Sequence, residues 1–198
     1  MRNDRRAWIV PGGVRAASVG ARAAAGAAIL LGSALVSTSP LAGQSDAPML
    51  RSGTFTTVTG QVIETDTLAG RVILVNAWAT WCGPCVLEMP AFQRVQDELG
   101  PRGFLVIGIS ADQEGPDVVR SFVDEMGITY PVTQGPHHVL GRLAAQVRGL
   151  PTSLLLDRNG RLVRKVEGVF PEEDLRRAVE ALLTEGSEVE APLAEDSG

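Results

Sequence analysis

The pattern of apolar and polar positions predicts two kinds of β-strand along the chain. Dense apolar runs at residues 71–77 and 104–110 have the composition of strands that are buried in a parallel sheet. Shorter segments are grouped in pairs around turn signals, which predicts two hairpins. These segments lie at 56–58 and 61–65, around Thr59-Gly60, and at 153–157 and 162–166, around a turn that ends in Asn159-Gly160.

Helices are predicted where apolar residues recur every three or four positions. One such stripe, between residues 88 and 99, is formed by Met89, Phe92, Val95 and Leu99. Further helices are expected at 116–126, 139–146 and 171–183. Because strands first alternate with helices, and a hairpin and a helix then close the domain, the order predicts an α/β fold. Its mixed sheet is expected to carry helices on both faces.

Residues 1–43 have the layout of a targeting segment. They carry five arginines and one aspartate, and their most apolar part runs from Ala27 to Val36, followed by small residues at 41–43. The apolar part is shorter than the roughly 20 residues of a membrane span, which favours a cleaved signal peptide. An uncleaved membrane anchor stays open as the alternative, because no charged residue follows until Asp46.

The segments on either side of the predicted domain, 54–184, are polar. Residues 44–53 are interpreted as a linker, and residues 185–198, with five acidic residues and little that could pack, as a disordered tail. The chain has a net charge of -5, which gives no basic surface for nucleic acid. A basic leader on an acidic body indicates an exported domain.

The chain has two cysteines, Cys82 and Cys85, three positions apart. A secreted fold stapled by disulfides would need more cysteines at wider spacing, and two cannot make a zinc site of four. No metal site is therefore expected. The pair is interpreted as chemically active rather than architectural.

The pair lies between the strand at 71–77 and the helix that follows it. A helix start favours negative charge, which stabilises a thiolate on Cys82. Because thiolates attack disulfides, Cys82 is expected to be the exposed nucleophile, and Cys85, one turn inward, to resolve the mixed disulfide. Gly83-Pro84 places no histidine beside the thiolate. This dipeptide is that of thioredoxin, with a potential of about -270 mV, so a reductant is expected.

The stretch Val72–Pro90 (VILVNAWATWCGPCVLEMP) closely resembles the TlpA/ResA family of exported thioredoxin-like proteins. Further matching motifs, in the same order, are Val106–Asp112, Val147–Asp157 and Asn159-Gly160. The resemblance runs from about Phe55 to Thr184. It implies a thioredoxin fold, with a mixed central sheet flanked by helices, an N-terminal β-hairpin and a helical insertion.

The same resemblance implies a role outside the cytoplasm, in the periplasm or an equivalent compartment. Proteins of the family reduce protein disulfides there, often in cytochrome c maturation, which makes apocytochrome c a candidate substrate. A membrane thiol-transfer protein would supply the electrons. The redox-active Cys82–Cys85 disulfide would need no organic cofactor or metal, and a monomer is expected.

The resemblance also implies roles for residues around the cysteines. Pro151 matches the family's cis-proline, which leaves the backbone of Leu150 free to pair with a substrate strand. Glu88, three residues after Cys85, matches an acid that would carry a proton during resolution, a role that needs a raised pKa. From spacing alone, a solvated helix glutamate remains the alternative.

Asn76 stands where cytoplasmic thioredoxin has a buried aspartate. Because asparagine cannot exchange a proton, Asn76 is expected to form structural hydrogen bonds and to leave the acid–base chemistry to Glu88 or water. Trp81 would offer a flat apolar surface to partners, whereas Trp78 is expected in the core. Pro90 should kink the helix.

The connection between Ala111 and Leu150 is long for a plain thioredoxin. An inserted helix and a short strand around residues 130–132 would fill it and adjust partner recognition. His137-His138 in this segment could be imagined with the cysteines as a copper site like that of Sco-type chaperones. Those proteins have CxxxC spacing rather than CxxC, so a solvated histidine pair is favoured.

The sequence is therefore compatible with three functions. The favoured one is an exported protein-disulfide reductase. The second is an oxidase or isomerase that uses the same cysteines, and the third is a redox-gated copper-binding partner protein.

Overall fold

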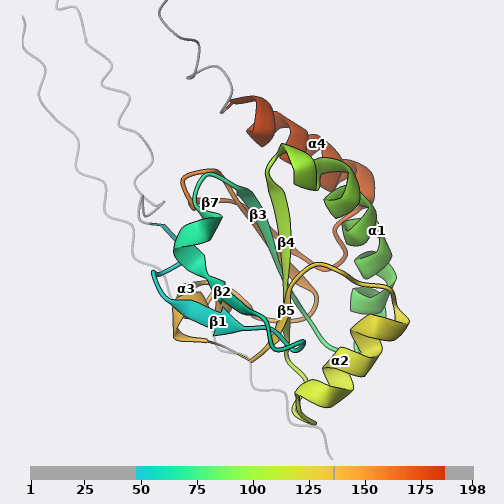
Figure 1. Ribbon diagram of the computed structural model, residues 1–198. Coiled ribbons are helices and arrows are strands. Elements are labelled where there is room, and N and C mark those ends of the chain that lie inside the picture. The colour runs from blue at the N-terminus through green and yellow to red at the C-terminus, as the bar shows by residue number, and fades with distance from the viewer. Residues whose placement is uncertain (1–47, 136, 186–198) are drawn as a thin grey trace, which may run out of the picture. The chain divides into compact units, whose positions relative to one another are not determined.

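The computed structural model describes residues 48–135 and 137–185. Its centre is a mixed sheet with the strand order β5-β4-β3-β6-β7 (Figure 1). The strands are β3 (Val72–Trp78), β4 (Phe104–Ser110), β5 (Val132–Gln134), β6 (Thr152–Leu156) and β7 (Leu162–Glu167). β3, β4 and β5 are parallel, whereas β6 is antiparallel to both β3 and β7. The predicted α/β class and mixed sheet are confirmed.

Two layers cover this sheet. The α-helices are α1 (Gly83–Leu99), α2 (Pro116–Glu125), α3 (Gly141–Ala144) and α4 (Glu172–Glu185). The 3₁₀ helices are η1 (Thr65–Leu68), η2 (Gly100–Arg102) and η3 (His138–Leu140). A separate hairpin pairs β1 (Thr54–Thr56) with β2 (Val62–Glu64). In Figure 1, α1, α2 and α4 lie on one face of the sheet, and the hairpin lies with α3 on the other.

β3 shows why the sheet needs both layers. All seven of its residues are buried. Because neighbouring side chains of a strand point to opposite faces, Leu74 and Trp78 join the apolar cluster beneath α1, α2 and α4, while Ile73 and Val75 join the cluster beneath the hairpin and α3. A dense apolar run is thus what a strand between two covered faces requires.

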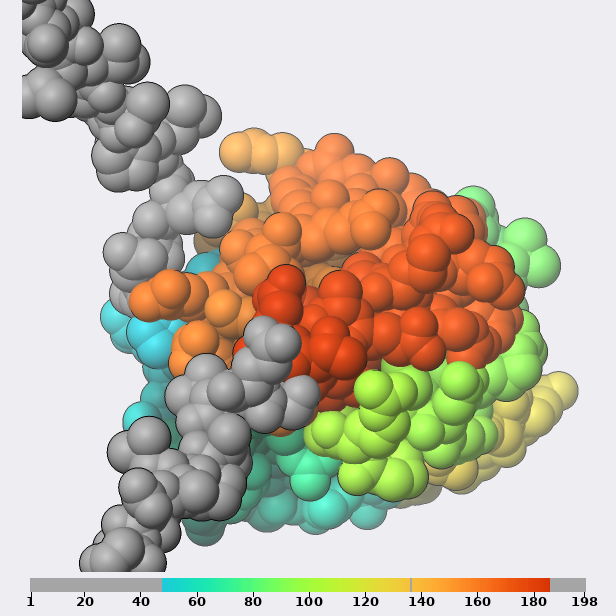
Figure 2. All heavy atoms as spheres, turned by 90° about the horizontal axis from the view of Figure 1, so that it is seen from above, coloured from blue at the N-terminus to red at the C-terminus, as the bar shows by residue number. Residues whose placement is uncertain are grey.

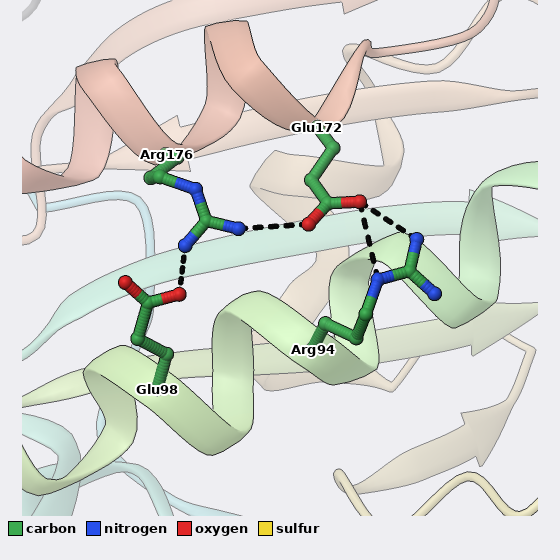
Figure 3. Close-up of polar contacts among 4 residues, drawn as sticks. All are labelled: Arg94, Glu98, Glu172 and Arg176. Carbon is green, nitrogen blue, oxygen red and sulfur yellow. Dashed lines mark hydrogen bonds and ion pairs between the residues drawn. The ribbon is translucent and has the colours of Figure 1, made fainter.

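α4 lies along α1 on the surface of the domain (Figure 2). An ion network joins the two helices (Figure 3). Glu172, in the first turn of α4, accepts hydrogen bonds from Arg94 and Arg176, each at 2.7 Å, and Arg176 also pairs with Glu98. The start of α4 is therefore fixed against the middle of α1.

The inserted segment between Ala111 and Leu150 contains the predicted strand, but one of its predicted helices is not continuous. β5 extends the sheet beside β4, close to the residues expected from the sequence. The helix predicted at 139–146 is instead η3 followed by the single turn of α3. Gly141 lies at the junction, and glycine is a poor helix former, which limits a continuous helix here.

Residues 48–53, predicted to belong to a linker, are packed against the domain. Met49 is buried, and its N–H donates to the Gly160 carbonyl at 2.8 Å. The carbonyl of Arg51 accepts the Thr65 hydroxyl at 2.7 Å. The polar composition of this segment did not predict the packing, because backbone groups form most of its hydrogen bonds. The domain therefore begins further toward the N-terminus than predicted.

The predicted boundary at the other end also shifts. Glu185, predicted to begin the tail, is the last residue of α4. The rest of the predicted tail, residues 186–198, lies outside the described residues, as do the predicted leader, 1–43, and residues 44–47 of the linker. Among the described residues, no helix combines the length and apolar character needed to cross a bilayer.

Candidate active site

The two cysteines lie where the chain leaves β3 and enters α1. Cys82 is the N-cap residue, with φ -90° and ψ 93°, and its carbonyl accepts the Val86 N–H at 3.1 Å. Gly83 begins the helix, and Pro84 lies in the first turn, where a missing N–H removes no helical bond. The positive end of the α1 dipole therefore lies at Cys82 and favours a thiolate there.

Cys82 and Cys85 form a disulfide, with their Cα atoms 5.3 Å apart. Cys82 is 7% exposed and Cys85 is fully buried. Cys82 is thus more exposed than Cys85, as predicted, but its exposure is smaller than predicted because Cys82 belongs to the apolar cluster beneath α1. Cys82 is therefore the more accessible of the two cysteines.

Exposed apolar side chains lie near the disulfide in the sequence. Trp81 is 67% exposed and Leu87 is 80% exposed, on either side of the pair. Trp78 is instead fully buried and packs against Phe122, with ring centroids 5.7 Å apart, as expected for a core residue. The two tryptophans therefore divide between surface and core.

Glu88 is buried in the second turn of α1, which excludes the solvated alternative. It is 3% exposed. Its Oε2 accepts the Phe170 backbone N–H at 2.9 Å, and its Oε1 accepts Asn76 Nδ2 at 2.9 Å. Burial raises the pKa of Glu88 to about 7, although both hydrogen bonds act in the opposite direction. A carboxyl with this pKa can accept and return a proton near neutral pH.

Asn76 links the sheet to this carboxyl. It lies in β3 opposite Ser153 of β6, and its Nδ2 donates to Ser153 Oγ at 3.1 Å as well as to Glu88. The expected hydrogen-bonding role is therefore what the geometry shows. Its Oδ1 has no partner among the residues that the structure describes.

The Leu150–Pro151 peptide bond is cis, as the resemblance implies. Pro151 is buried, and its carbonyl accepts the Gly168 N–H at 2.9 Å. Thr152, the next residue, pairs with Ala77 near the end of β3 that leads to Cys82. Leu150 packs against the cluster that contains both cysteines. The cis bond and the disulfide therefore lie at the same end of the sheet.

The two histidines do not form the solvated pair that was predicted. His138 is exposed, but His137 is half-buried, and its Nε2 lies 2.6 Å from Thr133 Oγ1. The His137 ring also lies 6.2 Å from that of Phe55. His137 is held by β5 and the hairpin, which the sequence pattern could not show. No cluster of three or more His, Cys, Asp or Glu residues suited to a metal ion occurs in the described ranges.

Phe170 is a site residue that sequence reasoning missed. It acts on Glu88 through its backbone N–H, a group that every residue except proline has, so no side-chain motif could reveal it. Its ring is buried, with the Arg164 guanidinium 4.9 Å from the ring centroid. Both contacts hold the strand-to-helix connection before α4 in place beside the site.

The site combines a cysteine at a helix N-terminus, a buried second cysteine and a carboxyl with a pKa of about 7. These groups suit exchange between this disulfide and the disulfide of a substrate. The chain is therefore a thiol–disulfide oxidoreductase with a thioredoxin fold. The Redoxin family model matches residues 42–183, and the chain belongs to this family, in its TlpA/ResA-like branch.

Known proteins with similar sequences or structures agree with this assignment. The thiol-disulfide oxidoreductase ResA of Bacillus thuringiensis (strain Al Hakam) is 33% identical over 121 residues, which cover 61% of this chain and 68% of the relative. A thioredoxin-family thiol:disulfide interchange protein from Chlorobium tepidum TLS has a TM-score of 0.64 and 29% identity, over 72% of this chain and 98% of its own. A secreted thiol-disulfide isomerase from Corynebacterium glutamicum has a TM-score of 0.59 and 25% identity, over 68% and 85%.

Proposed function

We propose that this protein is an exported protein-disulfide reductase that works through Cys82 and Cys85. The observation that carries the proposal is the buried Glu88, one turn along α1 from Cys85, with a pKa of about 7. Cys85 is fully buried in the disulfide form, so a protein group beside it would serve to take the proton from its thiol. Glu88 is a group of the right pKa on the same helix face.

The reaction transfers two electrons and two protons from the dithiol to the substrate. The Cys82 thiolate attacks one sulfur of a substrate disulfide, forms a mixed disulfide and releases the other substrate sulfur as a thiolate, which takes up a proton. Glu88 accepts the proton of Cys85, whose thiolate then attacks the Cys82 sulfur. The second substrate sulfur leaves as a thiolate and takes up the proton that Glu88 had accepted, and the Cys82–Cys85 disulfide closes. A protein dithiol must then reduce this disulfide, and no further redox group is needed.

The substrate would dock on the surface around Cys82. Trp81 and Leu87 offer exposed apolar area there, and the backbone of Leu150, before the cis-proline, would pair with an extended substrate segment. Unfolded or extended chains suit such a surface, because their backbone groups are free to form strand-like bonds. Apocytochrome c is the candidate substrate in this proposal.

The proposed location is outside the cytoplasm. The arginine-rich, apolar composition of residues 1–43 and the likeness to a secreted thiol-disulfide isomerase support it. Thiols in such a compartment tend to be oxidised, so the reductase would draw electrons from a membrane thiol-transfer protein. Signal cleavage and membrane anchoring are both compatible with this proposal.

Reduction of a protein disulfide tests the direction of the reaction. With a dithiol donor present, the full chain is expected to reduce insulin, and its measured potential should lie near that of thioredoxin, about -270 mV. The reason is that Gly83-Pro84 provides no histidine to stabilise the reduced form further. A redox titration against glutathione or dithiothreitol buffers gives the potential.

A potential near that of protein disulfide isomerase, about -180 mV, would contradict the reductase and favour the second candidate. That candidate, an isomerase with the same cysteines, is supported by the likeness to the secreted isomerase from Corynebacterium glutamicum. Recovery of activity from scrambled ribonuclease, without a dithiol donor in excess, separates the two.

A further inference from the structure

A buried carboxylate that the proposed reaction does not use holds the loop before the nucleophile. Asp112 follows β4 and is 5% exposed. Its Oδ2 accepts the Thr80 backbone N–H at 3.0 Å, and its Oδ1 accepts the Thr80 hydroxyl at 2.5 Å. The Ser110 hydroxyl donates to Oδ2 at 2.7 Å. One carboxylate thus fixes both the backbone and the side chain of the residue just before Trp81.

The same aspartate connects this loop to the inserted segment. Gln134, the last residue of β5, donates from Nε2 to the Asp112 carbonyl at 2.7 Å. Gln134 also lies beside Ser110 in the sheet, and the Gly135 N–H donates to the Ser110 carbonyl at 2.9 Å. A continuous path of hydrogen bonds therefore leads from β5 through Asp112 to Thr80.

Trp81 directly follows Thr80, so its backbone belongs to the loop that this path holds. Because two thirds of the side chain is exposed, at 67%, packing contacts cover little of the indole. The backbone of the loop, which Thr80 ties to Asp112, sets where the indole leaves the surface. A side chain that is already held in its bound orientation loses less entropy when a partner docks.

We propose that Asp112 and Gln134 are positioning residues that set the orientation of Trp81 and so the affinity for protein disulfides. This inference rests on the proposed docking of substrates at Trp81. The inserted segment tunes recognition through Gln134 without touching the substrate itself. Variation at the end of β5 is a route by which relatives of the same fold would differ in partner choice.

Gln134→Leu and Thr80→Val in the full chain test the inference. Each removes one side-chain link of the path, and Thr80→Val keeps its backbone N–H. We expect KM for insulin to rise about three- to tenfold, the range of one lost interface anchor, with kcat within about twofold. The rate with a small aromatic disulfide, dithiobis(nitrobenzoate), which is too small to need the Trp81 surface, should stay within the same twofold range.

The matched control is Thr129→Val. Thr129 belongs to the same inserted segment, and its hydroxyl accepts a hydrogen bond from Gln93 of α1 at 2.8 Å, away from the Asp112 path. This control is expected to leave KM unchanged, and Thr80→Ser, which keeps the hydroxyl, should restore the normal KM.

The outcomes separate this inference from the proposed function. Unchanged KM in both test variants, when Trp81→Ala raises KM, overturns the positioning role alone. Unchanged KM in Trp81→Ala overturns the proposed docking surface instead. A parallel fall in the rate with the small disulfide means that the path supports the cysteines rather than Trp81, which also overturns the inference.

Discussion

Replacing Cys82 with serine is expected to abolish disulfide exchange, with a fall in kcat/KM of about three orders of magnitude or more. Cys82 is the cysteine with solvent contact, at 7% against 0% for Cys85, so the buried thiol cannot replace it. A serine hydroxyl at a helix start stays protonated at neutral pH and does not attack a disulfide. Insulin reduction with a dithiol donor measures the loss.

Cys85→Ser gives the complementary result. Cys82 still attacks, but no second thiol resolves the mixed disulfide, so the covalent complex with a substrate should accumulate. Non-reducing gels and mass spectrometry of extracytoplasmic extracts would identify the trapped proteins. Equal capture by Cys82→Ser, which keeps only Cys85, would contradict the assigned order of the two cysteines.

Glu88→Gln is expected to slow the resolution step by about 10²-fold, a typical effect of losing a general base. In the unmodified chain, the rate should rise with pH through about 7 as Glu88 loses its proton. The variant should lack this rise. Single-turnover reduction of a peptide disulfide between pH 5.5 and 9 measures both effects. The matched control is Glu98→Gln, an exposed glutamate of the same helix, which should keep the normal profile.

Unfolding measurements separate this effect from instability. The folded-state pKa of Glu88, about 7, lies above its ordinary value of 4.5, so the folded protein holds a proton that the unfolded chain has released. The resulting stabilisation is complete below pH 4.5 and is lost as pH rises to about 7, a change of up to about 3 kcal/mol.

Glu88→Gln removes this dependence. As pH rises from 4.5 to 8, the free energy of unfolding of the variant, measured in urea, should therefore increase relative to that of the unmodified chain. A half-turn of the Asn76 side-chain amide would bring its Oδ1, which lacks a partner among the described residues, to the new amide as an acceptor. The same pH dependence of stability in the variant would show that Glu88 is not the buried group that titrates.

Residues with a distinctive side chain could be predicted from the sequence. The CxxC spacing identified Cys82 and Cys85 as a redox pair at a strand–helix junction. The dense apolar run before them predicted the buried strand β3. The roles of Glu88 and Pro151 needed the family resemblance, because a helix glutamate and a loop proline are common in any chain. Neither the burial of Glu88 nor the contacts of Pro151 could be predicted from the local pattern.

Contacts made by the backbone, or between distant segments, could not be predicted. The backbone N–H of Phe170 donates a hydrogen bond to Glu88, and no side-chain pattern in the sequence indicates such a bond. Met49 and its neighbours resemble a linker in composition, although their backbone bonds tie them to the domain. His137 had no visible partner until β5 and the hairpin brought Thr133 beside it. Each depends on tertiary proximity rather than on local pattern.

The docking of Met49 also determines where the domain would be tethered. Its N–H bonds to Gly160, in the turn between β6 and β7, at the end of the sheet where β3 begins. Cys82 lies beyond the opposite end of β3, whose seven residues span roughly 20 Å. A domain held by its N-terminal side would therefore present its disulfide at the free end.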